Sequence, residues 1–230
     1  MSKSKQQQIF IFLGAPGSGK GTLARMCVDT LHWKQLSTGD LCRKHIAEGT
    51  LLGAEIDFAI KSGTLVSDSV IIDMVGQWLE KEITLETSII LDGFPRTVPQ
   101  AEGFVKLMKN KLGNVRLRVI RFVIPDDVVI KRLSSRVVCS NRDCQRTFSS
   151  DPASSFLPKK SGVCDVCGFL LKEREDDKAE TIALRLDGYH HHVEHLMNFY
   201  TKAGYAIEDI SWQVSSEQVF KEFLMLVEQE

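Results

Sequence analysis

The chain has 230 residues, of which 43% are hydrophobic and 26% charged, and its formal net charge is −1. This length accommodates one core with smaller insertions, and the balanced charge creates no field that would favour nucleic acid or a membrane surface as a partner. No apolar stretch reaches the roughly 20 residues that span a bilayer. The N-terminal "MSKSKQQQIFIFLGAPG" lacks the features of a signal peptide. We therefore expect a cytoplasmic protein, in which paired cysteines are better metal ligands than disulfides.

Short apolar runs alternate with longer helical patterns along the chain. Buried strands are expected over 9–14, 88–94 and 117–125, with a last strand over 205–210. Helices are expected over 20–31, 39–47, 68–82, 98–111, 126–136, 177–202 and 215–229. This alternation predicts an α/β fold, in which helices cover both faces of a parallel sheet. The segment 137–174 breaks the alternation, and we interpret it as an insertion.

A glycine-rich loop, "GAPGSGKGT", lies between the first strand and the first helix. Its glycines, among them Gly17 and Gly19, let the backbone wrap around a polyphosphate, and the start of the helix adds its positive dipole. Lys20 is expected to reach the β- and γ-phosphates. The loop fits G-x-x-x-x-G-K, except that Gly21 takes the place of the usual Ser or Thr and Thr22 follows. This pattern predicts nucleotide binding, but alone it does not separate a kinase from a regulatory NTPase.

Two later motifs carry polar residues that suit a second phosphorylated substrate. "LSTGDLCR" contains Thr38, followed by Arg43 on a helix that we expect Asp40 to open. "KSGTLVSD" (61–68) predicts a turn and then a helix cap at Ser67 or Asp68. Taken alone, Arg43 is equally compatible with a solvated helix face, so its place after the phosphate loop is what favours a binding role.

A third motif, "ILDGFPRTVPQA", ends a buried strand with Asp92 and turns at Gly93. It places Arg96 and Gln100 at the carboxyl end of that strand, the edge where open α/β sheets bind ligands. Strand-end carboxylates beside a phosphate loop hold Mg²⁺ through water, which predicts this role for Asp92. Alone, Asp92 is also compatible with a plain turn.

In this order and spacing, "GAPGSGKGT", "LSTGDLCR", "SGTLVSD" and "LDGFPRTVPQA" resemble the adenylate kinases, a family of P-loop nucleoside monophosphate kinases. The likeness continues through "KRLSSR" (131–136), "EREDDKAETIALRL" (173–186) and the last strand, covering about residues 8–225. The long insertion resembles that of the long-form members with a zinc-binding lid. The resemblance implies a monomer whose partners are ATP, AMP and ADP rather than nucleic acid or membrane, and which transfers phosphate from MgATP to AMP.

The resemblance also implies a role for each matching residue. ATP would contact Gly17, Ser18, Gly19, Lys20, Gly21, Thr22, Arg132, Thr147 and Phe148. AMP would contact Thr38, Arg43, Thr64, Leu65, Val66, Gly93, Phe94, Pro95, Arg96, Gln100, Arg174 and Arg185. Catalysis would depend on Lys20, Asp92, Arg96, Arg136, Arg174 and Arg185. Asp176 and Asp177 match an acidic pair that helps to close the lid.

These residue types suit the implied reaction on chemical grounds. The attacking group is a phosphate oxygen that is already anionic, so no general base is needed. Catalysis then consists of aligning two nucleotides in line and neutralising the charge on the transferred group. The fixed fork of donors on arginine serves that purpose better than lysine does.

The likeness divides the chain into a core (1–36, 67–136 and 175–230), an AMP-binding helical insertion (37–66) and a lid (137–174). A kinase must keep water from hydrolysing ATP, and a lid that closes over the phosphates does this. We expect both insertions to move when substrates bind.

Four cysteines in the lid segment form two pairs, Cys139-x4-Cys144 and Cys164-x2-Cys167. About 40 residues are too few for an independent hydrophobic core, and a structural Zn²⁺ held by four thiolates would replace one. The first pair departs from the two-residue spacing usual in the family, which bears on Cys144 in particular. Four inert thiols, a weak site and a disulfide remain alternatives.

Other conspicuous residues have plainer interpretations. "HHVEH" fits an H-x-x-E-H metal motif at His191, Glu194 and His195, but we expect a solvated helix face there. Cys27 and Cys42 are expected to be small core residues, and "SKSK" a frayed tail.

Two alternative functions remain open. One is a nucleoside monophosphate kinase with another base preference, such as GTP with AMP. The other is a P-loop regulatory protein whose zinc module binds nucleic acid, although balanced charge and the lack of aromatic residues among basic ones count against it.

Overall fold

The computed structural model describes residues 7–62, 66–83, 87–111, 115–141, 144–211 and 215–228. Its core is a five-stranded parallel sheet with the strand order β2–β3–β1–β4–β8. The strands, from one edge to the other, are β2 (Lys34–Ser37), β3 (Ile89–Asp92), β1 (Gln8–Gly14), β4 (Arg116–Val123) and β8 (Ile207–Ser211). The prediction of a parallel sheet in an α/β fold is therefore confirmed.

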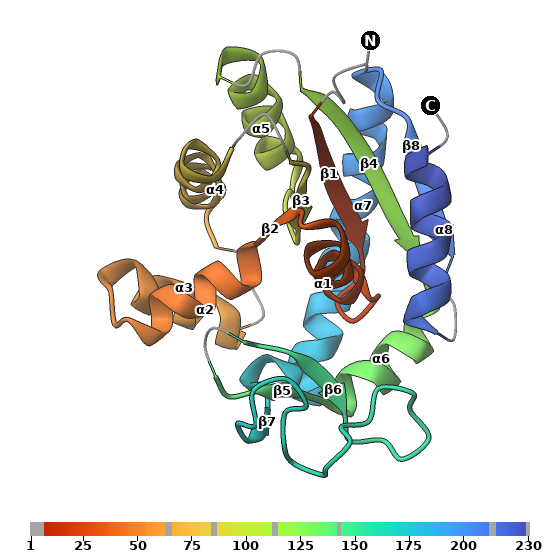
Figure 1. Ribbon diagram of the computed structural model, residues 1–230. Coiled ribbons are helices and arrows are strands. Elements are labelled where there is room, and N and C mark those ends of the chain that lie inside the picture. The colour runs from red at the N-terminus through yellow and green to blue at the C-terminus, as the bar shows by residue number, and fades with distance from the viewer. Residues whose placement is uncertain are drawn as a thin grey trace.

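Helices cover both faces of the sheet because the side chains of β1 alternate between two apolar clusters. Ile9 and Ile11 pack against α4 (Asp68–Glu82), α5 (Val98–Lys111) and α7 (Ala179–Lys202). Phe10 and Phe12 face the other way, toward α1 (Lys20–Leu31) and α8 (Ser216–Glu228). These four side chains are at most 1% exposed, and burying each contributes about 1.5–3 kcal/mol. The central strand is thereby fixed from both sides (Figure 1).

Every strand and helix predicted from the pattern is present, and no described end differs by more than two residues. The predicted helix over 126–136 ends at Ser134 (α6, Asp126–Ser134), because a strand begins at Arg136. The predicted helix over 177–202 begins at Ala179, after a single 3₁₀ turn. Strand β2 was not predicted, because its four residues, "KQLS", include one buried side chain, Leu36, and are too few to show a clear periodicity.

Two antiparallel helices, α2 (Thr38–Ala47) and α3 (Leu51–Ser62), project from the core. The expectation that Asp40 opens α2 was wrong, because Ser37 is the N-cap and its Oγ accepts from the backbone N–H of Asp40 at 3.2 Å. A Cβ on Gly53 would lie 2.2 Å from the carbonyl oxygen of His45, so glycine permits the close approach of α3 to α2. Helix α3 was not predicted as a separate element.

A second, three-stranded antiparallel sheet forms the cysteine-rich insertion, with the strand order β6–β5–β7. Its strands are β5 (Arg136–Cys139), β6 (Thr147–Ser149) and β7 (Leu171–Glu173). In Figure 1 this small sheet lies beyond the carboxyl ends of β1 and β4. Within the described part of the chain, no helix is both long and apolar enough to cross a membrane.

Candidate active site

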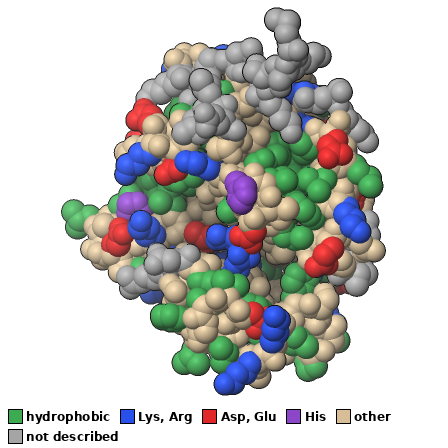
Figure 2. Space-filling model, viewed as in Figure 1, with side chains coloured by type: hydrophobic (Ala, Val, Ile, Leu, Met, Phe, Trp, Pro, Cys, Tyr) green, Lys and Arg blue, Asp and Glu red, His purple; other side chains and the backbone are tan. Residues whose placement is uncertain are grey.

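A cavity of about 760 Å³ lies where the core, the α2–α3 pair and the small sheet meet. Natural ligand sites have volumes of about 300–1,000 Å³, and the carboxyl edge of a parallel sheet is where such sites form. On the face shown in Figure 2, side chains of both charges gather around the hollow above the small sheet. The cavity therefore has the size and polarity of a site for a charged ligand.

The phosphate loop forms one wall of the cavity, and its backbone turns where a side chain would not fit. Gly17 and Gly19 have φ values of 76° and 102°, in the left-handed region that favours glycine. A Cβ on Gly14 would lie 2.8 Å from Ser18 Oγ, and one on Gly17 would lie 2.9 Å from Leu133 Cδ2. Gly19 is also the N-cap of α1, so the positive end of that helix opens on the cavity.

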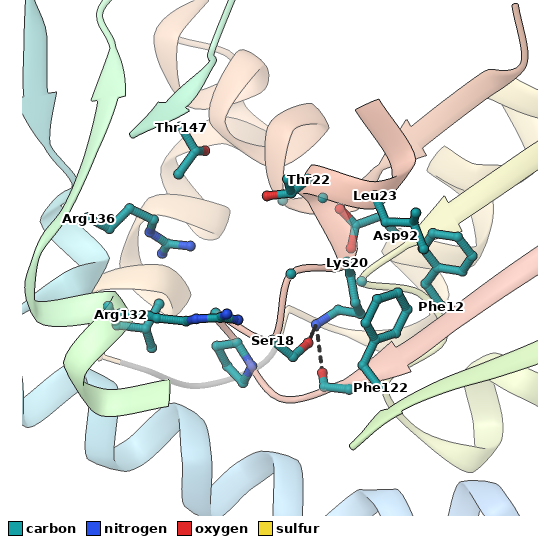
Figure 3. A pocket seen from close by; sticks show the side chains of 18 of the residues that line it. Phe12, Ser18, Lys20, Thr22, Leu23, Asp92, Phe122, Arg132, Arg136 and Thr147 are labelled. Atoms are coloured by element: carbon teal, nitrogen blue, oxygen red, sulfur yellow. Dashed lines mark hydrogen bonds between the residues drawn. The ribbon is translucent and has the colours of Figure 1, made fainter. Parts of the chain in front are cut away.

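Lys20 folds its ammonium group back over this loop. Nζ donates hydrogen bonds to the carbonyl oxygens of Gly14 at 2.7 Å and Ala15 at 2.8 Å. It also donates to Ser18 Oγ at 3.1 Å (Figure 3). Burial lowers the pKa of Lys20 to about 8, although the nearby charge of Asp92 acts in the opposite direction. An anion in the loop would favour the charged ammonium.

Asp92 stands at the end of β3, directly beside the loop. A Cβ on Gly21 would lie 3.1 Å from Asp92 Oδ2, so the carboxylate occupies space that Ser or Thr would need at position 21. Gln35 of β2 donates from Nε2 to the same oxygen at 3.4 Å. Burial raises the pKa of Asp92, and the charge of Lys20 opposes that effect. A half-buried carboxylate beside a phosphate loop is a suitable donor for Mg²⁺ or its water ligands.

The residues expected to hold a second substrate lie on α2 and in the turn after β3. Thr38 Oγ1 donates to the carbonyl oxygen of Gly93 at 2.9 Å, and Arg96 Nε donates to the same oxygen at 2.9 Å. Arg43 forms an ion pair with Asp40 on the same helix. These contacts tie α2 to the β3–α5 turn and place two guanidinium groups in the lining of the cavity.

Further arginines enter from the small sheet and from α7, and two carboxylates hold them in place. Arg136 donates to both oxygens of Asp177, from Nε at 2.6 Å and from Nη2 at 2.5 Å. Arg185 Nη1 donates to Asp177 Oδ1 at 3.0 Å and lies 3.1 Å from Asp176 Oδ2. Such bidentate pairs fix the planes of the guanidinium groups. Asp176 and Asp177 therefore orient the arginines that they accompany.

Positive charge in this cluster is only partly neutralised. Burial, followed by the neighbouring guanidinium groups of Arg43 and Arg136, lowers the pKa of Arg174 to about 9. Arg132 and Arg136 approach the cavity from one side, with Lys20 and its loop on the other (Figure 3). Several arginines and one lysine converging on a cavity form a site for a polyanion, because an anion would remove this mutual repulsion.

Nearly all residues predicted for ATP, AMP or catalysis line this one cavity. The ring of Phe94 is an exception, since it is 1% exposed and packs edge-on against Phe104 in the core, with the centroids 5.6 Å apart. An apolar ring is more stable there than in a charged cavity. Thr64 and Leu65 lie outside the described residues, whereas Val66 lines the cavity.

Gln35 and His192 are among the lining residues that sequence reasoning missed. Gln35 lies on the unpredicted strand β2, so no pattern indicated that it would face Asp92. His192 was hidden among neighbouring histidines. Its spacing offered a signal, because it follows Arg185 by seven residues and thus shares a face of α7 with it.

The four cysteines of the insertion converge. Their sulfur atoms all lie within 4.8 Å of one another, with Cys139 Sγ 3.3 Å from Cys167 Sγ and Cys144 Sγ 3.7 Å from Cys164 Sγ. A tetrahedral zinc site with Zn–S bonds of about 2.3 Å has sulfur–sulfur edges of about 3.8 Å. Cys144 therefore reaches the cluster despite its four-residue spacing. Burial raises the pKa of Cys139 to about 12, so a bound cation would be needed to hold it as a thiolate.

The remaining conspicuous residues behave as expected. His191, Glu194 and His195 are exposed on α7, and in the described residues the cysteine cluster is the one group of three or more ligands close enough to hold a metal. Cys27 and Cys42 are buried. The "SKSK" segment lies outside the described residues.

Comparison with known proteins gives a consistent result over nearly the whole chain. The family model described as "Adenylate kinase" matches residues 12–205. An adenylate kinase of Treponema denticola is 43% identical over 213 residues, which cover 93% of this chain and 96% of that protein. One from Borreliella burgdorferi is 36% identical over 217 residues, covering 94% and 97%. One from Methanothrix thermoacetophila is 38% identical over 214 residues, covering 92% and 94%.

Proposed function

Because the chain belongs to the adenylate kinase family, we propose that it transfers the γ-phosphoryl group of MgATP to AMP, giving two ADP, and that it catalyses the reverse reaction. The observation that carries this proposal is the lining of the cavity, where a phosphate loop and two sets of arginines meet. One phosphate loop suits one polyphosphate, and the arginines beyond it suit a second phosphorylated ligand.

The donor nucleotide occupies the loop side of the cavity in this proposal. Backbone N–H groups of residues 17–22 hold the phosphates, and Lys20 carries charge to the β- and γ-positions. Arg132 lies against the donor base, and Thr147 and Phe148 of β6 cover the nucleotide. The lining of the cavity by all three residues supports this arrangement.

The acceptor occupies the side formed by α2 and the β3–α5 turn. Arg43 and Arg96 bind its phosphate, and Gln100 contacts its base. The remaining acceptor residues of the proposal are Thr38, Thr64, Leu65, Val66, Gly93, Pro95, Arg174 and Arg185, with the backbone of Phe94.

The transfer itself requires charge neutralisation rather than proton removal. The attacking phosphate oxygen of AMP is anionic, and the transferred group spreads its charge over three equatorial oxygens. Arg136, Arg174 and Arg185 stabilise that charge, while Asp176 and Asp177 keep the guanidinium groups oriented. The small sheet excludes water, which would otherwise compete with AMP as the nucleophile.

Two cations complete the proposal. Mg²⁺, when bound with the donor, supplies positive charge along the phosphates, and Asp92 would hold it through water. The fit rests on a half-buried carboxylate that lies beside the loop and lines the cavity. Zn²⁺ would be held by Cys139, Cys144, Cys164 and Cys167. It would supply stability to the small sheet rather than chemistry, because four protein ligands leave no open position.

We assign the parts of the chain accordingly. The core (1–36, 67–136 and 175–230) carries the phosphate loop, residues 37–66 form the AMP-binding insertion, and residues 137–174 form the lid. Each cavity side draws on one insertion, and the whole site is contained in one chain. We therefore propose that the monomer is active.

A transfer assay with purified protein and Mg²⁺ tests this function. ATP and GTP are crossed as donors with AMP, GMP, CMP and UMP as acceptors. We expect rapid ADP formation from ATP with AMP alone. If phosphate is transferred from GTP, or to another acceptor, the proposed site is retained and the substrate assignment is wrong. If no pair reacts, the proposed activity is wrong, and retention on a polynucleotide column at physiological salt would support the regulatory alternative.

A further inference from the structure

Gln100 is held in a way that fixes which end of its amide faces which neighbour. The residue is 2% exposed and lines the cavity. Its Oε1 accepts a hydrogen bond from the backbone N–H of Arg96 at 2.8 Å. Its Nε2 donates one to Oδ1 of Asp68, the first residue of α4, at 2.8 Å.

Both neighbours permit one direction of the amide. A backbone N–H can only donate, and an ionised carboxylate can only accept. If the amide turned over, its oxygen would face the Asp68 carboxylate and its NH₂ would face the N–H of Arg96, so both contacts would become unfavourable. Reversal is costly because Gln100 is buried, so its amide cannot exchange these two partners for water.

Asp68 is itself held in place from α5. Thr97 Oγ1 donates to Asp68 Oδ1 at 2.8 Å and accepts from the backbone N–H of Gln100 at 3.3 Å. The sequence predicts Ser67 or Asp68 as the cap of α4. The N-cap is Ser67, which makes no side-chain cap bond, and the carboxylate of Asp68 points across to α5 instead. Its contacts therefore serve Gln100 and Thr97 more than the start of its own helix.

We propose that Asp68 is a positioning residue that locks the Gln100 amide and thereby makes the acceptor site select adenine over guanine. This inference rests on the proposed function and deepens it. Gln100 keeps one lone pair on Oε1 and one N–H on Nε2 for a ligand. At the 6-position and N1, adenine offers a donor and then an acceptor, whereas guanine offers an acceptor and then a donor. With the sugar and phosphate fixed, an amide of fixed direction matches one purine and opposes the other.

The size of the effect follows from the contacts that oppose reversal. In the parent protein a reversed amide loses two partly buried hydrogen bonds. In Asp68→Asn it loses one, since the asparagine side chain can donate as well as accept, and the hydroxyl of Thr97, which shares Oδ1 of Asp68 in the parent, can turn to accept from it. One buried polar contact corresponds to about a tenfold change in affinity. The substitution preserves the size and shape of the side chain, so it separates the direction of the amide from packing.

The experiment measures kcat/KM for AMP and for GMP, with ATP as donor, in the parent, in Asp68→Asn and in Asp73→Asn. Asp73 lies on the exposed face of the same helix, so its variant is a matched control. We expect the AMP-to-GMP ratio to fall about tenfold in Asp68→Asn and to stay at the parental value in Asp73→Asn. Asp68→Glu, which keeps an acceptor-only group, should retain most of the selectivity.

Two results would overturn the proposal that Asp68 fixes the direction of the Gln100 amide. One is an unchanged ratio in Asp68→Asn. The other is an equal loss of kcat/KM for both acceptors, which would indicate a purely structural role. Calorimetric binding of AMP and GMP to the same proteins gives the ratio without turnover. If the parent protein binds AMP selectively but transfers no phosphate, the proposed function is wrong. The binding ratio in Asp68→Asn would still test whether Asp68 fixes the Gln100 amide.

Discussion

The phosphate loop and the small sheet face each other across the cavity, yet different forces hold them in shape. The loop is shaped by packing, since a Cβ on Gly14 or Gly17 would come within 2.9 Å of a neighbouring atom, and the strand before it is buried. The small sheet has little apolar interior, and Val166, Phe169 and Leu170 are 54–70% exposed. It contains instead a cluster of four cysteine sulfurs, and Arg136 forms an ion pair with Asp177. The first region is preformed by the core, whereas the second depends on charge and, we propose, on a metal.

Arg136→Ala tests whether the small sheet takes part in the chemistry or only covers it. Arg136 lies at the start of β5, and both oxygens of Asp177 orient it. Loss of one preorganised donor to a transition state costs about 10²–10³ in kcat, and we expect a loss of that size in steady-state assays. Arg116→Ala, an exposed change at the amino end of β4, is the control. An unchanged kcat in Arg136→Ala would mean that Arg136 takes no part in the chemistry and that the small sheet only covers the nucleotides.

Cys144→Ser should lower the stability of the small sheet without lowering that of the core around the phosphate loop. We expect purified protein to hold one zinc per chain and this variant to bind it at least about 100-fold more weakly, since even residues behind the ligands contribute 10–100-fold. Amide hydrogen exchange should accelerate in the small sheet and stay slow in β1 and β4. Cys27→Ala, a cysteine change in the core, should retain the metal while lowering the stability of the sheet around α1. Equal metal content in both variants would refute the zinc assignment.

Lys20 provides a pH test that is specific to the loop. Its pKa of about 8 lies well below the usual 10.5, and bound phosphate favours the ammonium, so nucleotide binding requires proton uptake above pH 8. The affinity for ATP should fall by up to about tenfold per pH unit above 8, as measured by calorimetry. The free energy of unfolding changes with pH in the opposite direction. Between pH 8 and 10.5 the unfolded chain binds more protons at Lys20 than the folded chain does, so the contribution of this group to stability rises with pH.

Lys20→Met is the control for this pH dependence. The variant should bind ATP weakly, and its affinity should stay nearly constant from pH 7 to 9. If its affinity falls with pH as steeply as that of the parent, the titrating group is not Lys20.

The same contrast explains what could be predicted from the sequence. The phosphate loop depends on contiguous residues, so its glycines and lysine identified it directly. The two cysteine pairs were also predicted to converge, because four thiolate ligands suit a single Zn²⁺ ion. The residues whose roles were not predicted depend on partners far away in the sequence or lie in short elements. Gln35 lies on a four-residue strand without periodicity, and Asp68 resembled a helix cap until the fold brought Thr97 and Gln100 beside it. Phe94 shared a motif with binding residues, but its ring belongs to the core.

One ion pair joins the insertion that carries the small sheet to α1, the helix that follows the phosphate loop, and its loss has the smallest predicted effect. Arg146, next to β6, lies 2.7 Å from Asp29 of α1, and the side chains are 29% and 45% exposed. Exposed pairs contribute about 0–1 kcal/mol, so Asp29→Asn should raise the KM for ATP by at most about fivefold, because the small sheet closes less readily. The difference should disappear at high salt, where surface charges are screened. A difference that persists in 0.5 M KCl would mean that Asp29 acts through packing of α1, and the two regions would then share more than charge.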